Sequence, residues 1–170
     1  IQSVIKAKSG INKTIDISVS KDGHLDTSMN FSIGKRIKMD GILTFRKRDE
    51  TIYYMLSAKN IDFNVQSEDS INGTITFRGT TGSKDIAEKE SKKGNYRIFD
   101  AYSSEKTDEN NYTYIWVHFV DFSSERPAFL QPKVGIDAEG VLELTIYNGK
   151  ENIGCLVKTI SQWDKQSSNG

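Results

Sequence analysis

The sequence is short of cysteine, proline and long apolar runs. A single cysteine, Cys155, excludes an internal disulfide, and a reducing cytoplasm is the simpler expectation for such a chain. The two prolines, Pro127 and Pro132, lie close together, and helix signals are scarce elsewhere. No apolar run approaches the ~18 residues of a membrane helix and no signal peptide is visible, so we expect no membrane partner.

Residues that carry catalysis or bind metals are also scarce. The two histidines, His24 and His118, have no Cys/His spacing typical of zinc sites, and neither a phosphate-cradling glycine loop nor a serine-nucleophile motif occurs. Asp137 and Glu139 share a strand face without a partner acid. Cys155 is most simply a small buried hydrophobe. We therefore expect no enzyme, no catalytic residue, no metal and no cofactor.

Charge is balanced over the whole chain but unevenly divided along it. The totals are 23 Lys and Arg against 23 Asp and Glu, which alone indicate neither nucleic acid nor membrane as a partner. Residues 1–66 carry 11 basic and 7 acidic side chains, a net charge of +4, whereas residues 67–170 carry 12 and 16, a net charge of −4. The two parts therefore present different surfaces or face each other.

What the chain has in abundance is the alternation of apolar and polar residues that is typical of β-strands. This period of two predicts an all-β fold. The polar stretch 80–93 is expected to be a loop or a short helix. Strands are predicted over residues 4–7, 14–19, 25–31, 37–45 and 53–61, and again over 71–77, 96–102, 112–122, 134–146 and 153–163.

The strand pattern of the first part recurs in the second. Adding 99 to the residue number takes Gly41 to Gly140 without a gap around it, and further upstream an offset of 83 takes Ile15 to Ile98. A glycine in the middle of a strand permits the sharp bend that a small barrel requires. Alternation alone makes any all-β chain match itself in part, so chance similarity is the competing explanation.

We interpret the recurrence as two tandem modules. The first spans residues 1–66 and the second, with longer loops, spans residues 67–170. Each is predicted to be a small five-stranded barrel.

Three runs in the second module carry a resemblance to a known family. They are Tyr96-Arg97-Ile98-Phe99, Trp116-Val117-His118-Phe119-Val120 and the glycine-containing strand 134–142. This pattern resembles the bacterial and phage single-stranded DNA-binding proteins, which have the oligonucleotide/oligosaccharide-binding (OB) fold. The resemblance implies two OB-like modules and non-catalytic binding of single-stranded DNA. The sequence departs from the family in lacking an acidic tail, and its second half is net acidic.

The strand 112–120 is predicted to place aromatic side chains on one face. Because side chains alternate across a strand, Ile115 and Val117 should fill the barrel while residues of even number face outward. Bases stack on such rings with about 1–3 kcal/mol each, whatever their identity. The predicted stacking residues are Tyr112, Tyr114, Trp116 and His118, with Tyr96 and Tyr102 from the neighbouring strand. The basic residues predicted to meet phosphates are Arg97, Lys92 and Lys93, and Arg36, Lys38, Arg46 and Arg48 in the first module.

Two alternatives stay open at the level of sequence. The aromatic face would be structural if it packs against the first module or a long loop. The whole chain would act through protein–protein contact if it is a viral or phage structural subunit or a secreted β protein. Four N-x-S/T sequons, at Asn12, Asn30, Asn72 and Asn111, favour that second function. The leading prediction is a phage, plasmid or bacterial replication protein that binds single-stranded DNA or RNA, alone, as a homo-oligomer or with a replication-protein partner.

Overall fold

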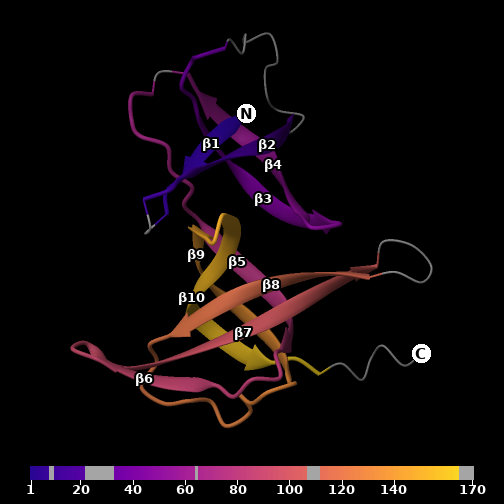
Figure 1. Cartoon of the computed structure of the whole chain (residues 1–170), viewed down its shortest axis with the longest axis vertical. Coiled ribbons are helices and arrows are strands. Elements are labelled where there is room, and N and C mark those ends of the chain that lie inside the picture. The colour runs from indigo at the N-terminus through magenta and orange to yellow at the C-terminus, as the bar shows by residue number, and fades with distance from the viewer. Residues whose placement is uncertain (8–9, 22–32, 64, 107–111, 165–170) are drawn as a thin grey trace.

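The fold consists of strands and the loops between them. The computed structural model describes residues 1–7, 10–21, 33–63, 65–106 and 112–164, which contain ten strands and no helix (Figure 1). The predicted all-β class is therefore confirmed. None of these residues forms a helix with the length and apolar character needed to cross a membrane.

Six strands form the larger sheet, in the second part of the chain. They are β5 (Thr74–Thr81), β6 (Ala87–Ser91), β7 (Gly94–Lys106), β8 (Tyr112–Asp121), β9 (Gly135–Tyr147) and β10 (Lys150–Gln162), in the order β5-β9-β10-β8-β7-β6. The end of β5 also pairs with β7, through Thr80 with Tyr102 and Thr81 with Ala101. Five strands thus close into a ring, the architecture of an OB fold, and β6 lies outside it against β7.

Four strands form the smaller sheet, in the first part. They are β1 (Gln2–Ile5), β2 (Lys13–Lys21), β3 (Lys38–Arg48) and β4 (Thr51–Asp62), in the order β1-β2-β4-β3. Its one parallel pair is β2 with β4, just as β8 and β10 are the parallel pair of the ring. This sheet therefore has the topology of β7-β8-β10-β9. The further strand predicted at 25–31 lies outside the described residues.

The two sheets also agree in strand register. Adding 99 converts the pair of Leu43 and Leu56 on β3 and β4 into the pair of Leu142 and Cys155 on β9 and β10. The turns correspond too, because Asp49 and Asn148 both have positive φ, at 53° and 51°. The 99-residue offset found in the sequence is therefore a structural correspondence between two hairpins.

The offset predicted for the upstream strands is wrong. Adding 100, not 83, converts the pair of Ser3 and Ile15 on β1 and β2 into the pair of Ser103 and Ile115 on β7 and β8. The counterpart of β2 is thus β8, and the counterpart of β1 is β7. The sequence misled because strands with the same period of two match one another at many offsets.

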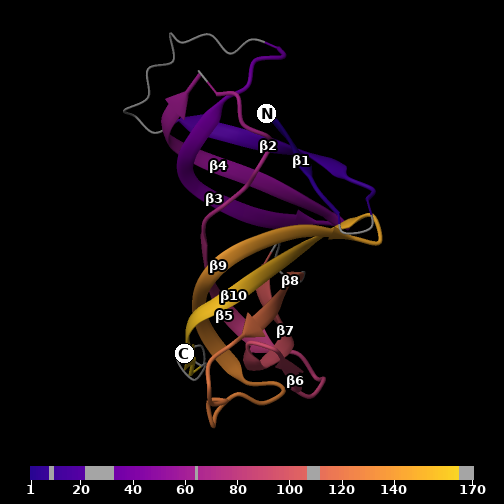
Figure 2. The ribbon, with the colours of Figure 1, turned by 90° about the vertical axis from the view of Figure 1, so that its left-hand side faces the viewer.

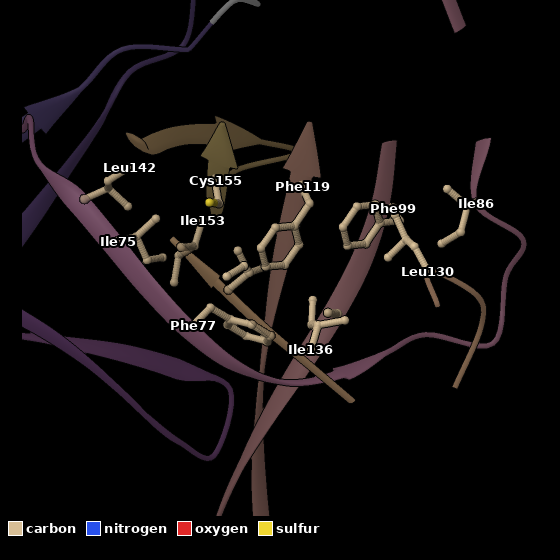
Figure 3. Close-up of a cluster of buried hydrophobic side chains, with 13 residues drawn as sticks. Ile75, Phe77, Ile86, Phe99, Phe119, Leu130, Ile136, Leu142, Ile153 and Cys155 are labelled. Carbon is tan, nitrogen blue, oxygen red and sulfur yellow. The ribbon is translucent and has the colours of Figure 1, made fainter. Parts of the chain in front are cut away.

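The ring encloses the main hydrophobic core (Figure 3). Phe119 at its centre stacks on Phe99, with ring centroids 5.0 Å apart, and meets Phe77 edge-on at 5.1 Å. Leu130, from the segment between β8 and β9, is fully buried in the same cluster. Cys155 is buried there as predicted, and its burial raises the pKa of the thiol to about 11.

A second core lies under the first sheet and joins it to the ring. Ile5, Ile15, Ile17 and Tyr54 form this cluster together with Ile146 from the end of β9. Figure 2 shows the β9–β10 hairpin reaching the first sheet near the end of β1. Leu43, Phe45, Ile52, Ile71 and Leu144 pack against both clusters.

The polar stretch 80–93 contains a strand where a loop or short helix was expected. Its β6 pairs with β7 across a tight turn in which Gly94 has a φ of 117°. Four of the five β6 residues are exposed, and only Ala87 is half-buried. A strand that is exposed on both faces has no reason to alternate, so its sequence gave no strand signal.

We predict that a methyl group at the central glycine of β9 strains the ring. A Cβ at Gly140 would lie 2.0 Å from the carbonyl oxygen of Leu156, whereas one at Gly73 would meet no atom within 4 Å. Gly140→Ala should therefore lower the free energy of unfolding by about 1–3 kcal/mol, as overpacking does. Gly73→Ala should change it by less than about 1 kcal/mol. Urea denaturation of both variants measures this, and equal effects would contradict the steric account.

Candidate nucleic-acid interface

The candidate interface is built on the alternation of β8. Val117 and Phe119 point into the ring and are 3% and 0% exposed. The even-numbered side chains of the strand point the other way, and Tyr114 and Trp116 are 47% and 51% exposed. Tyr112 at the start of the strand is 54% exposed. The side chains of Tyr112, Tyr114 and Trp116 lie on the outer face of the five-stranded ring and are not covered by the first sheet.

A fourth ring joins them from β7. Tyr102 is the cross-strand partner of Trp116, and its ring centroid lies 5.1 Å from Trp116 and 5.7 Å from Tyr114. The indole of Trp116 also rests on Gly82, where a Cβ would lie only 3.2 Å from the ring. We call Tyr102, Tyr112, Tyr114 and Trp116 the aromatic patch. Neighbouring rings and the bare backbone of Gly82 hold its tryptophan in place.

His118 follows the patch along β8 and is flanked by carboxylates. Its Nδ1 lies 2.7 Å from Oδ1 of Asp100, its partner across β7. On the other side it pairs with Gly154 of β10, whose partner on β9 is Glu143. The hydrogen bond to Asp100 raises the pKa of His118, against the effect of burial, and the charges of Asp100 and Glu143 add to the rise. Protonation of this histidine therefore changes the charge beside the aromatic patch.

Tyr96 lies at the other end of the same face, away from the patch. It lies six positions before Tyr102 on β7, which is about 20 Å along a strand. Its ring instead contacts Phe122, with centroids 5.0 Å apart. Phe122 is 49% exposed and was missed in the sequence, although it continues the even-numbered series that runs from 112. Lys92 and Lys93 are exposed in the β6–β7 turn at this end.

Arg97 was predicted to meet a phosphate at the surface, but its side chain is buried. Its side chain is only 3% exposed, and Nη1 donates to Oδ2 of Asp121 at 2.7 Å. Glu88 on β6 and Ser123 after β8 accept further hydrogen bonds from the guanidinium. The reason is alternation, because Arg97 lies on the opposite face of β7 from Tyr96 and Ile98. A phosphate could reach it only by breaking a buried ion pair, so we exclude Arg97 from the interface.

The four basic residues predicted in the first part divide between the two ends of β3. Nε of Arg46 lies 4.0 Å from Oε1 of Glu105 on β7, so this end of β3, with Arg48, adjoins the β7–β8 hairpin. Figure 1 shows both hairpins extending to the same side. Lys38 begins the strand about 30 Å from Arg48, and Arg36 precedes it, donating to the carbonyl of Ser67 and bound to Asp69. Of the four, Arg46 is therefore the residue that an ion pair holds at β7, and its partner Glu105 alternates with Tyr102 and so lies on the opposite face of β7 from the aromatic patch.

The described residues offer no alternative site for metal chemistry. Nowhere in residues 1–7, 10–21, 33–63, 65–106 and 112–164 do three or more His, Cys, Asp or Glu side chains gather as potential ligands of one ion. The groups that distinguish the outer face of β7 and β8 are therefore rings and a few charges, which suit stacking and ion pairing.

Comparison with known proteins gives matches among solved structures alone. No protein-family model matches the sequence, and no curated protein matches it. The small single-stranded DNA-binding protein of Streptomyces coelicolor is 12% identical, over 59% of this chain and 100% of that one, with a TM-score of 0.44. A deletion mutant of the single-stranded DNA-binding protein from Thermus aquaticus is 15% identical, over 98% of this chain and 80% of that one, with a TM-score of 0.43. Both belong to the family that the sequence pattern resembles.

We predict that His118 titrates above the ordinary histidine pKa of about 6.5. Asp100→Asn removes the hydrogen bond and the nearest charge, so the pKa of His118 should fall in that variant. Proton NMR across pH 5–9, with His118→Gln to assign the signal, measures both values.

The same shift predicts how stability depends on pH. The pKa of His118 is higher in the folded than in the unfolded protein. Its interaction with Asp100 therefore stabilises the fold fully below the unfolded pKa, and this stabilisation is lost as pH rises through the folded pKa. The difference in free energy of unfolding between the native chain and Asp100→Asn should therefore shrink as pH rises. A difference that grows with pH would contradict the assignment.

Proposed function

We propose that this chain is a non-catalytic protein that binds single-stranded DNA on the outer face of β7 and β8. The observation that carries the proposal is the aromatic patch, in which the ring of Tyr102 contacts those of Tyr114 and Trp116, while Tyr112, Tyr114 and Trp116 are each about half exposed. A soluble protein has little reason to expose so many large rings together unless something covers them. Every base has a flat face, so such rings bind a single strand without reading its sequence.

Stacking on the aromatic patch supplies most of the affinity in this proposal. Each base stacked on a ring contributes about 1–3 kcal/mol. Tyr96 and Phe122, further along the same face, offer a second place for a base. A strand that reaches both passes Asp100 and His118, where a protonated histidine offsets the carboxylate.

A few cations at the two ends of the face meet the phosphates. Arg46 and Arg48 lie at the end of β3 that adjoins the β7–β8 hairpin, and Lys92 and Lys93 lie in the turn at the end of the face that carries Tyr96. With one phosphate each, these four residues give a slope of log affinity against log salt of about −3, since each contact on a single strand contributes about −0.7. Binding is then only moderately sensitive to salt, consistent with a second half that is net acidic.

We also infer that residues 1–66 and 67–170 are two modules of one ancestral design. The support is the shared topology and the matching registers at offsets of 99 and 100. The two modules would then differ in function, because small or acidic residues occupy the positions in the first part that correspond to Tyr114, Trp116 and His118. These are Thr14, Asp16 and Ser18.

Loss of one ring tests the proposal. Trp116→Ala should weaken binding of a fluorescein-labelled oligo-dT by about 5- to 150-fold, the equivalent of 1–3 kcal/mol, in fluorescence anisotropy at low salt. Trp116→Phe keeps a stacking ring and should lose much less. The same assay with oligo-U compares DNA with RNA.

Two results would count against the proposal in different ways. Binding that is unchanged in Trp116→Ala would show that the strand lies elsewhere on the protein. A native chain that binds no oligonucleotide at low salt would refute the function itself and favour a protein partner for the aromatic patch.

A further inference from the structure

The first sheet has a free edge where the ring has a strand. In the ring, β9 pairs with β10 on one side and with β5 on the other. Its counterpart β3 pairs with β4, and none of the described strands pairs with its other side. β3 therefore presents the backbone edge that β9 gives to β5, and a row of main-chain donors and acceptors along such an edge readily accepts another strand.

An apolar groove runs along this edge. Its volume is about 1650 Å³, and its lining includes Met39, Gly41 and Leu43 of β3 together with Ile17 and Leu56. Residues of β1 and of the segment 67–73 line another side, and the space continues to the ring, where Ile75, Phe77, Ile115 and Val117 also line it. The groove thus extends from the ring into the space between β3 and β1, which is the position that β5 occupies between their counterparts β9 and β7.

The ring shows which strand such a groove accepts. β5 runs antiparallel to β9 with Ile75 opposite Gly140, and Phe77 follows two residues later on the same face. Both side chains are buried in the core of the ring. Subtracting 99 from their partner positions on β9 gives Gly41 and Met39, which line the groove of the first sheet.

We propose that the first sheet binds an extended segment of another protein as an added strand, antiparallel to β3. Main-chain hydrogen bonds to the edge provide affinity, and the groove that Gly41 and Met39 line selects apolar side chains two residues apart. The partner is therefore a β-strand-forming segment with the pattern of β5, apolar at alternate positions and polar between them. This site shares no residue with the aromatic patch and does not depend on DNA binding.

A peptide with the sequence of residues 72–82, which contains β5, serves as the probe. When it is added to the full chain at ten times its dissociation constant, the outward-pointing amides of residues 38–45 should exchange about tenfold more slowly in hydrogen-exchange NMR. A control peptide with aspartate in place of Ile75 and Phe77 should give no protection. Met39→Asp in the protein should abolish the protection by the first peptide and leave oligo-dT binding unchanged.

Each other outcome overturns the proposal. Protection confined to β9 would mean that the peptide only exchanges with β5 of the ring. Amides of β3 that are already slow in the isolated chain would mean that the edge is closed without a partner, by the chain itself or, if slowing depends on concentration, by a second copy. Absence of protection at millimolar peptide would mean that the groove does not accept a strand.

Discussion

The opposed directions of neighbouring side chains on β8 determine where function can lie in this molecule. Phe119 is the centre of the ring core, stacked on Phe99 and in contact with Phe77. Because the side chain of Phe119 points into the core, the two-residue period of β8 makes the side chains of Trp116 and Tyr114 point outward. The same packing that stabilises the ring therefore also builds the aromatic patch, and a register shift of one residue would destroy both.

The same arrangement of four strands, which we call the frame, occurs in both parts of the chain, but its closure and its outer face differ between them. The two hairpins with a central glycine, β3–β4 and β9–β10, have the same strand register residue for residue. A Cβ added to either glycine would lie within 2.1 Å of a carbonyl oxygen on the paired strand. In the second part β5 closes the frame into a ring, and the outer face carries aromatic side chains. In the first part the described strands leave the frame open, and the equivalent outer positions are polar. We infer that the closed frame binds nucleic acid and the open frame binds a strand of protein.

The sequence predicted those features that depend on local alternation. Strand positions, the outward direction of Trp116 and the burial of Cys155 follow from the period of two and from hydrophobicity. It also predicted the 99-residue offset, since a glycine in mid-strand is a rare enough marker to align two hairpins. Strand β6 was not predicted because it is exposed on both faces, so its residues do not alternate between apolar and polar.

Features that depend on distant partners could not be predicted in this way. Arg97 was predicted to meet phosphate, although alternation with Tyr96 places it on the other face of β7, and it is the pairing with Asp121, 24 residues away, that makes burial of its charge tolerable. Arg36 and Arg46 looked equivalent in sequence, yet they lie toward opposite ends of β3, and Arg36 is already bound to Ser67 and Asp69. Local pattern gives the face of a strand but not which end of it meets another element.

The most direct test of the central claim uses the two indole groups of the chain as opposing probes. Trp116 lies in the aromatic patch, whereas Trp163 lies against Arg78 and its amide is bound to Gly135. Oligo-dT of about 12 nucleotides, within the usual site size, is titrated into the protein while both indole N–H signals are followed by NMR. We expect the Trp116 signal to shift and the Trp163 signal to stay. An oligonucleotide that binds while the Trp116 signal stays in place would contradict the account.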